Sequence, residues 1–239
     1  MPKKTTAVSN VVSVDAIIES LADKKLAVRE KALLELCDAS RKYIINETVV
    51  NKKSLDLMTA LLACLKKGAK AEALQTCTTL QAVIVACNDT LNESFDENVY
   101  SLGLQLRSHP SDAVRGKVAT VISLGALLCG LHEESVSKIM ERLSGYFRDS
   151  SSEVVAACLR GWTLLASSLP DAVLSVRRGL YLEELAAPLQ RDGTSADVAA
   201  VRVAAAQVRQ LPSPATWACL GAAAHQIHGC LDPLRCLGP

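Results

Sequence analysis

Residues 112–121 read DAVRGKVATV, and the fold prediction begins from this segment. An acidic residue and an alanine lead into a Val-Arg pair, which is followed by apolar residues at the spacing of a helix face. Related segments occur as LAVREKALLEL around Val28, AEALQTCTTL around Glu72, SEVVAACLRG around Val154 and ADVAAVRVAA around Val198. Successive copies are 44, 42, 40 and 44 residues apart. A drifting period of this size is typical of HEAT and armadillo arrays of paired helices.

We therefore predict an all-α protein, an α-solenoid of about five HEAT/armadillo-like two-helix repeats. A single helix pair cannot cover its own apolar face, whereas stacking buries a continuous core between neighbours. Pro110 ends one predicted helix, and Ser111 or Asp112 can cap the next. The predicted helices cover residues 14–22, 26–45, 52–67, 70–87, 95–107, 112–129, 133–148, 152–168, 171–190, 195–211 and 214–231.

Three parts of the chain are predicted. The solenoid occupies residues 14–211, residues 1–13 form a flexible basic N-terminus, and residues 212–239 form a C-terminal helix and an apolar tail. Of the 239 residues 49% are hydrophobic, which is enough for one short repeat array. Because only 3% of the residues are aromatic, the core is expected to be aliphatic.

The cysteines and the apolar runs indicate the compartment. The nine cysteines are an odd number without a CxxC pair, which argues against a disulfide framework. No apolar run is long enough to cross a membrane, and no signal peptide is evident. We expect a cytoplasmic protein without membrane contact, with a nuclear location as the alternative.

Motifs for catalysis are absent from the sequence. There is no P-loop, GxGxxG, GxSxG or HExxH. We therefore predict that the protein is not an enzyme and has no catalytic residue, no cofactor and no small-molecule substrate.

The C-terminus gathers residue types that zinc prefers. Their spacing, C-x5-H-x2-H-x-C-x5-C, matches no common finger or ribbon. We predict no metal site, and expect an apolar tail that packs locally. The metal-site alternative would use Cys219, His225, His228, Cys230 and Cys236.

Charge is unevenly distributed along the chain. Residues 1–70 carry a net charge of +5, residues 71–160 of −4 and residues 161–239 of zero. The basic N-terminal region is either a solvated helix surface or a surface that contacts nucleic-acid phosphates, while residues 93–97 and 133–134 form an acidic zone. The candidate RNA-binding residues are Lys24, Lys25, Arg29, Lys31, Arg41, Lys42, Lys52, Lys53, Lys66, Lys67 and Lys70.

Four stretches resemble, in order, the N-terminal domain of the interferon-related developmental regulator family. They are residues 25–36, which contain REKAL, residues 61–68, which contain LKKG, residues 82–93, and residues 124–129, which read LGALLC. The first two are the more specific. The resemblance covers roughly residues 14–190 and implies an armadillo/HEAT-like solenoid without known catalytic activity.

The resemblance also implies two roles: binding to translationally idle ribosomes, which blocks the path of tRNA or mRNA, and transcriptional co-regulation through nuclear corepressor complexes. The first agrees better with the basic N-terminal repeats, because ribosomal RNA presents dense phosphate. We therefore predict a ribosome hibernation factor that binds rRNA and ribosomal proteins and represses translation. The alternative is a nuclear adaptor that binds corepressor proteins. Residues 210–239 carry only two charged residues. We therefore do not assign to this chain the way in which longer relatives block the ribosomal channel.

Overall fold

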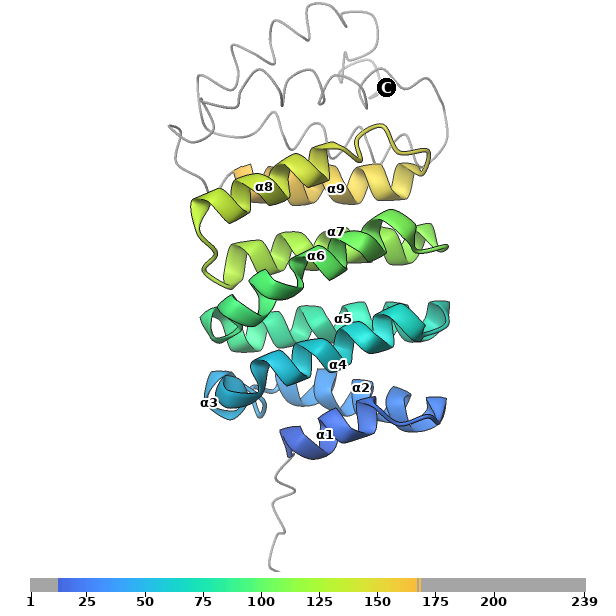
Figure 1. The fold of residues 1–239 in the computed structure, drawn as a ribbon, viewed down its shortest axis with the longest axis vertical. Helices are drawn as coiled ribbons and strands as arrows, with labels where there is room; N and C mark the ends of the chain where they lie inside the picture. Colours follow the sequence, from blue (N-terminus) through green and yellow to red (C-terminus); the bar gives the residue numbers. More distant parts are fainter. Residues whose placement is uncertain (1–12, 167, 169–239) are drawn as a thin grey trace, which may run out of the picture.

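The computed structural model describes residues 13–166 and 168, which form a stack of four antiparallel helix pairs (Figure 1). The pairs are α1 (Val14–Leu21) with α2 (Leu26–Arg41), α4 (Ser54–Lys67) with α5 (Lys70–Cys87), α6 (Asn92–Ser108) with α7 (Asp112–Leu128), and α8 (Glu133–Ser144) with α9 (Ser152–Ala166). Short helices fill two of the turns between pairs: α3 (Glu47–Val50) with the 3-10 helix η1 (Asn51–Lys53), and the 3-10 helix η2 (Asn88–Leu91). The predicted all-α solenoid is confirmed. The predicted helices within residues 171–231, and the predicted boundary at 211, lie outside the described residues.

The stack has two layers of helices. The second helices of the pairs, α2, α5, α7 and α9, pack on one another in sequence, and the first helices, α1, α4, α6 and α8, form the other layer. Val28, Glu72, Val114 and Val154, which mark the repeated segment, are each the third residue of a second helix. The period read from the sequence is therefore the period of the structure. No helix of the described part combines the length and apolar character that a membrane span needs.

The core runs through the stack as one continuous cluster of mainly aliphatic side chains. Phe95 and Phe147 are the largest fully buried side chains. Phe95 lies against Gly125 of α7, where a Cβ atom would come within 2.1 Å of the Phe95 ring. A glycine in the middle of a helix, unfavourable by propensity, is thus explained by the close approach of an aromatic ring.

Several helix ends differ from the prediction. Helix α2 ends at Arg41 instead of residue 45, because Tyr43 adopts a left-handed conformation with φ 54°. The amides of Ile44 and Ile45 then both donate to the carbonyl of Ala39, at 2.9 and 3.2 Å, and close the helix. Helix α8 ends at Ser144, before Gly145.

The predicted cap of the helix after Pro110 was partly wrong. Ser111 is the N-cap residue of α7, but its side chain makes no capping hydrogen bond. The Asp112 side chain instead accepts a hydrogen bond from Arg115, at 2.9 Å. The Asp112 carboxylate thus takes part in a charge-assisted hydrogen bond with an arginine one turn later.

The six cysteines of the described part are all buried and free. Burial raises the pKa of the Cys77, Cys87, Cys129 and Cys158 thiols to about 12. At pH 8 only about one in ten thousand of these groups is then the reactive thiolate. We expect brief treatment of the native protein with N-ethylmaleimide to leave these four cysteines unlabelled, and treatment in denaturant to label them all. Peptide mass spectrometry provides the measurement; native labelling as fast as that of a cysteine peptide would contradict the packing.

Candidate nucleic-acid interface

The turn inside each helix pair lies on the same edge of the stack. The α1–α2, α4–α5, α6–α7 and α8–α9 turns follow one another along this edge, whereas the connections between pairs lie on the opposite edge (Figure 1). We call the two sides the intra-pair edge and the inter-pair edge.

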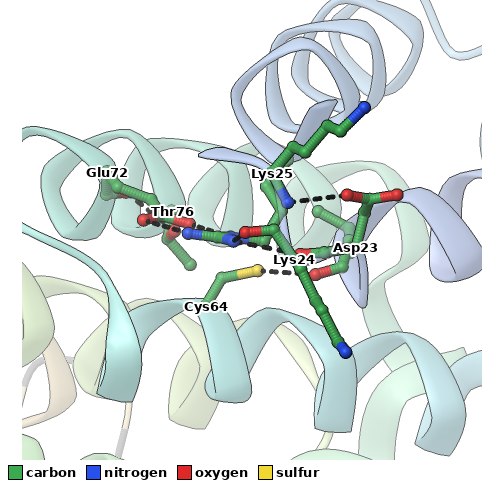
Figure 2. A network of polar contacts seen from close by, with 8 residues as sticks. Asp23, Lys24, Lys25, Cys64, Glu72 and Thr76 are labelled. Carbon is green, nitrogen blue, oxygen red and sulfur yellow. Dashed lines mark hydrogen bonds and ion pairs between the residues drawn. The ribbon is translucent and has the colours of Figure 1, made fainter. Parts of the chain in front are cut away.

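Arg29, the arginine of a Val-Arg pair, joins the α1–α2 turn to the start of α5 at the intra-pair edge. Its Nε and Nη2 atoms donate to Glu72 Oε1 and Oε2 at 2.6 and 3.0 Å. Its Nη1 atom donates to the carbonyls of Asp23 and Lys24, each at 3.0 Å. Figure 2 shows this network together with the Cys64 thiol, which donates to the carbonyl of Leu21 at 3.4 Å. The first helix pair is thus tied to the second by polar contacts.

Arg115, at the same place in α7, repeats the arrangement between the third and fourth pairs. Its Nε atom donates to the carbonyl of Leu106 at 2.9 Å, and its guanidinium forms ion pairs with Asp112 and with Asp149 of the next turn. Arg29 and Arg115 are each the fourth residue of their helix. The arginine of the repeated segment therefore joins a turn to the next helix pair.

Three carboxylates of the intra-pair edge form ion pairs with these two arginines. Glu72, with 2% of its side chain exposed, is paired with Arg29, and Asp112 and Asp149 are paired with Arg115. The hydrogen bonds that Arg29 donates to Glu72 raise the pKa of Arg29, so its guanidinium stays charged at neutral pH. Asp23, in the first turn, instead accepts a hydrogen bond from the backbone amide of Lys25, at 2.7 Å.

Seven exposed cations without an ion pair among the described residues follow this edge, and we call them the basic ridge. In the first pair the side chains of Lys24 and Lys25 point away from the Arg29 network in different directions (Figure 2). The ridge continues over the later turns. Its members are Lys24, Lys25, Lys66, Lys67, Lys70, Arg107 and Arg148.

The structure brings together only five of the eleven candidates from the sequence: Lys24, Lys25, Lys66, Lys67 and Lys70. A second group is at the inter-pair edge, where Lys42 pairs with Asp38 at 3.3 Å and Lys53 with Asp15 at 3.0 Å. The members of this group are Arg41, Lys42, Lys52 and Lys53. Lys31 lies on the exposed face of α2 and pairs with Glu35, and Arg29 is held by Glu72. Antiparallel pairing sends consecutive turns to opposite edges, which separates residues that are close in the sequence.

Arg107 and Arg148 belong to the ridge but were missed by sequence reasoning. Lys25, Lys67, Arg107 and Arg148 follow one another at spacings of 42, 40 and 41 residues. Alignment of the repeats on one another, instead of a count of charges in blocks, would have placed them together. The residues of the metal-site alternative, within 219–236, lie outside the described residues. In the part that the structure describes, no cluster of His, Cys, Asp and Glu could hold a metal ion.

Comparison with known proteins adds the family. The sequence profile described as "Interferon-related developmental regulator (IFRD)" matches residues 3–208. The chain belongs to this family. The resemblance found in the sequence is thus confirmed, and the match of this IFRD chain includes all four helix pairs that the structure describes. A search of curated proteins found no match.

Among solved structures the IFRD chain resembles a designed armadillo repeat protein, YIII(Dq)4CqI. The TM-score is 0.56 at 14% sequence identity, and the alignment covers 88% of this chain and 98% of the designed one. At this identity the likeness concerns the fold alone. It supports the assignment of an armadillo-like solenoid.

Proposed function

We propose that this IFRD chain is a non-enzymatic, cytoplasmic scaffold that binds the ribosome through its basic ridge and silences or protects idle ribosomes. The observation that carries the proposal is the ridge itself: seven exposed cations on one edge, without ion pairs among the described residues. The chain belongs to the IFRD family, and the resemblance to that family implies ribosome binding. The ridge is the surface of the described part that best suits rRNA.

The spacing of the ridge suits a phosphate backbone. Packed helices lie about 8–10 Å apart, so four pairs place cations along an edge of about 25–30 Å. Lysine side chains on such an edge attract phosphates without reading bases. The only exposed aromatic side chains of the described part, Tyr43 and Tyr100, lie outside the ridge, which argues against a stacking platform for single strands. Binding should therefore follow the shape and charge of rRNA.

The mechanism would be steric. A rigid stack that lies on rRNA occupies space that tRNA, mRNA or a translation factor needs, and no covalent chemistry is required. Ribosomal proteins next to the contacted rRNA would complete the interface.

The test compares two edges of the same molecule. One variant replaces Lys24, Lys25, Lys66 and Lys67 with alanine, and the matched control replaces Arg41, Lys42, Lys52 and Lys53 with alanine. Both lose four positive charges. We expect the ridge variant to lose cosedimentation with purified ribosomes at lower salt than the wild type. Its plot of log affinity against log salt should flatten by about one unit of slope for each phosphate contact removed.

The inter-pair control should cosediment nearly as the wild type does. Equal losses in the two variants would show that net charge, and not the ridge, determines binding. Full retention of the ridge variant on ribosomes at all salt concentrations would contradict the proposal.

A second candidate function is a nuclear adaptor that binds corepressor proteins in transcriptional co-regulation. One observation favours it: Tyr100 and Leu104 of α6 are 62% and 42% exposed, on the layer of first helices. Exposed apolar side chains of this kind mark protein contacts more often than RNA contacts. Affinity purification of the tagged chain from starved cells separates the candidates, since rRNA is expected with the first and histone-modifying proteins with the second.

A further inference from the structure

A groove opens between α6 and α8. Helix α4 packs closely along α6, whereas α6 and α8 approach each other at few points. The groove has a volume of about 400 Å³, and its floor is aliphatic, made by Leu106, Ile122, Ile139 and Leu143. Gly103 also lines it and contributes no side chain. A recess of this size and polarity is within the range of binding sites for small groups.

The rim of the groove carries tyrosine and arginine side chains. Arg142 lies over the ring of Tyr100, with its Cζ atom 5.8 Å from the ring centroid. Its Nη1 atom is 3.6 Å from the position of a Cβ atom on Gly103. Arg107 and Tyr146 lie on the same rim. Tyrosine and arginine are enriched among the residues that dominate binding energy at protein interfaces.

The rim of the groove is positively charged, because Arg107 and Arg142 both line it. None of the residues that line the groove is acidic, and neither Arg107 nor Arg142 forms an ion pair with another described residue. Two guanidinium groups beside an apolar recess are complementary to a carboxylate next to a large apolar side chain.

We propose that this groove binds a short segment of a partner protein in which Leu or Phe lies beside Asp or Glu. The apolar side chain enters the recess over Ile122 and Ile139, and the carboxylate pairs with Arg142 or Arg107. A nucleic acid fits less well, because a base would need an aromatic face and one face of Tyr100 is covered by Arg142. The groove is a surface distinct from the basic ridge, with which it shares only Arg107.

The test begins with a phage-displayed random peptide library selected on the full chain. We expect the enriched peptides to place Leu or Phe next to Asp or Glu. One enriched peptide, labelled with fluorescein, is then titrated with wild type and two variants by fluorescence anisotropy. Gly103→Leu fills the recess and Arg142→Glu reverses the charge of the rim. Each is expected to weaken binding at least tenfold.

Three controls keep the result interpretable. Arg160→Glu, an exposed change on α9, should bind the peptide as the wild type does, and circular dichroism should show all variants folded. The alanine variant of Lys24, Lys25, Lys66 and Lys67 should also keep full peptide affinity, so that failure of the ridge and failure of the groove are distinguishable. Lack of enrichment, or enriched peptides that bind both groove variants with unchanged affinity, would overturn the proposal. The proposal would also be overturned if the Gly103→Leu variant bound the peptide as the wild type does but no longer bound an oligouridine probe.

Discussion

Replacement of Arg29 by alanine is expected to lower the free energy of unfolding by about 3 kcal/mol, because it leaves a buried carboxylate without its partner. The Glu72 side chain is 2% exposed and accepts two hydrogen bonds from the Arg29 guanidinium. The change also removes the donor to the carbonyls of Asp23 and Lys24. Urea unfolding followed by circular dichroism measures the difference.

Two further variants identify the cause of this loss. Lys31→Ala, on the same helix, removes only an exposed pair with Glu35 and should cost less than about 0.5 kcal/mol. The double variant Arg29→Met, Glu72→Met removes both charges, and it should recover most of the stability that either single change loses. If Arg29→Ala were no less stable than Lys31→Ala, the ion pair would have no role in joining the first two helix pairs.

Replacement of Gly125 by alanine is expected to destabilise the protein by about 2 kcal/mol, although alanine is the better helix former by about 1 kcal/mol. The added Cβ atom would lie 2.1 Å from two ring carbons of Phe95. Phe95 is fully buried, so its ring can move only by displacing other core side chains. Thermal and urea unfolding of the variant give the size and sign of the effect.

The matched control is Gly116→Ala in the same helix. There the added Cβ atom meets its nearest neighbour, Glu153 Cγ, at 3.5 Å, an ordinary contact. This variant should be as stable as the wild type or gain up to about 1 kcal/mol. Combining Gly125→Ala with Phe95→Leu should restore part of the loss, since the smaller side chain makes room. Equal effects of the two glycine changes would contradict the packing of Phe95 on α7.

The repeat and its register could be predicted from the sequence, because both depend on local patterns. The repeated segment recurs at the same place in the second helices, with Val28, Glu72, Val114 and Val154 as third residues, and helical spacing of apolar residues identifies the rest. The end of α2 could not be predicted. Tyr43 takes the left-handed conformation that is usually taken by glycine. A tyrosine at this position gives no indication that a helix ends there.

The candidate site was only partly predictable. Counting lysines along the chain joined Lys52 and Lys53 to Lys66 and Lys67, yet the antiparallel pairing places them on opposite edges. The partner of Arg29 lies 43 residues away and across a helix contact, which a motif search does not reveal. The groove likewise depends on how far α6 and α8 separate, a property of packing and not of either helix alone.

The Arg29 and Arg115 contacts do not recur at every junction. The equivalent place in α5 is Ala73, and no side-chain hydrogen bond or ion pair among the described residues crosses from α5 to α7. In the part of the chain that the structure describes, the stack therefore consists of two halves, each joined internally by an arginine network, and a joint between them held by apolar packing, which has no preferred direction. Changes of curvature meet the least resistance at this joint, and it separates the lysines of the ridge from its arginines.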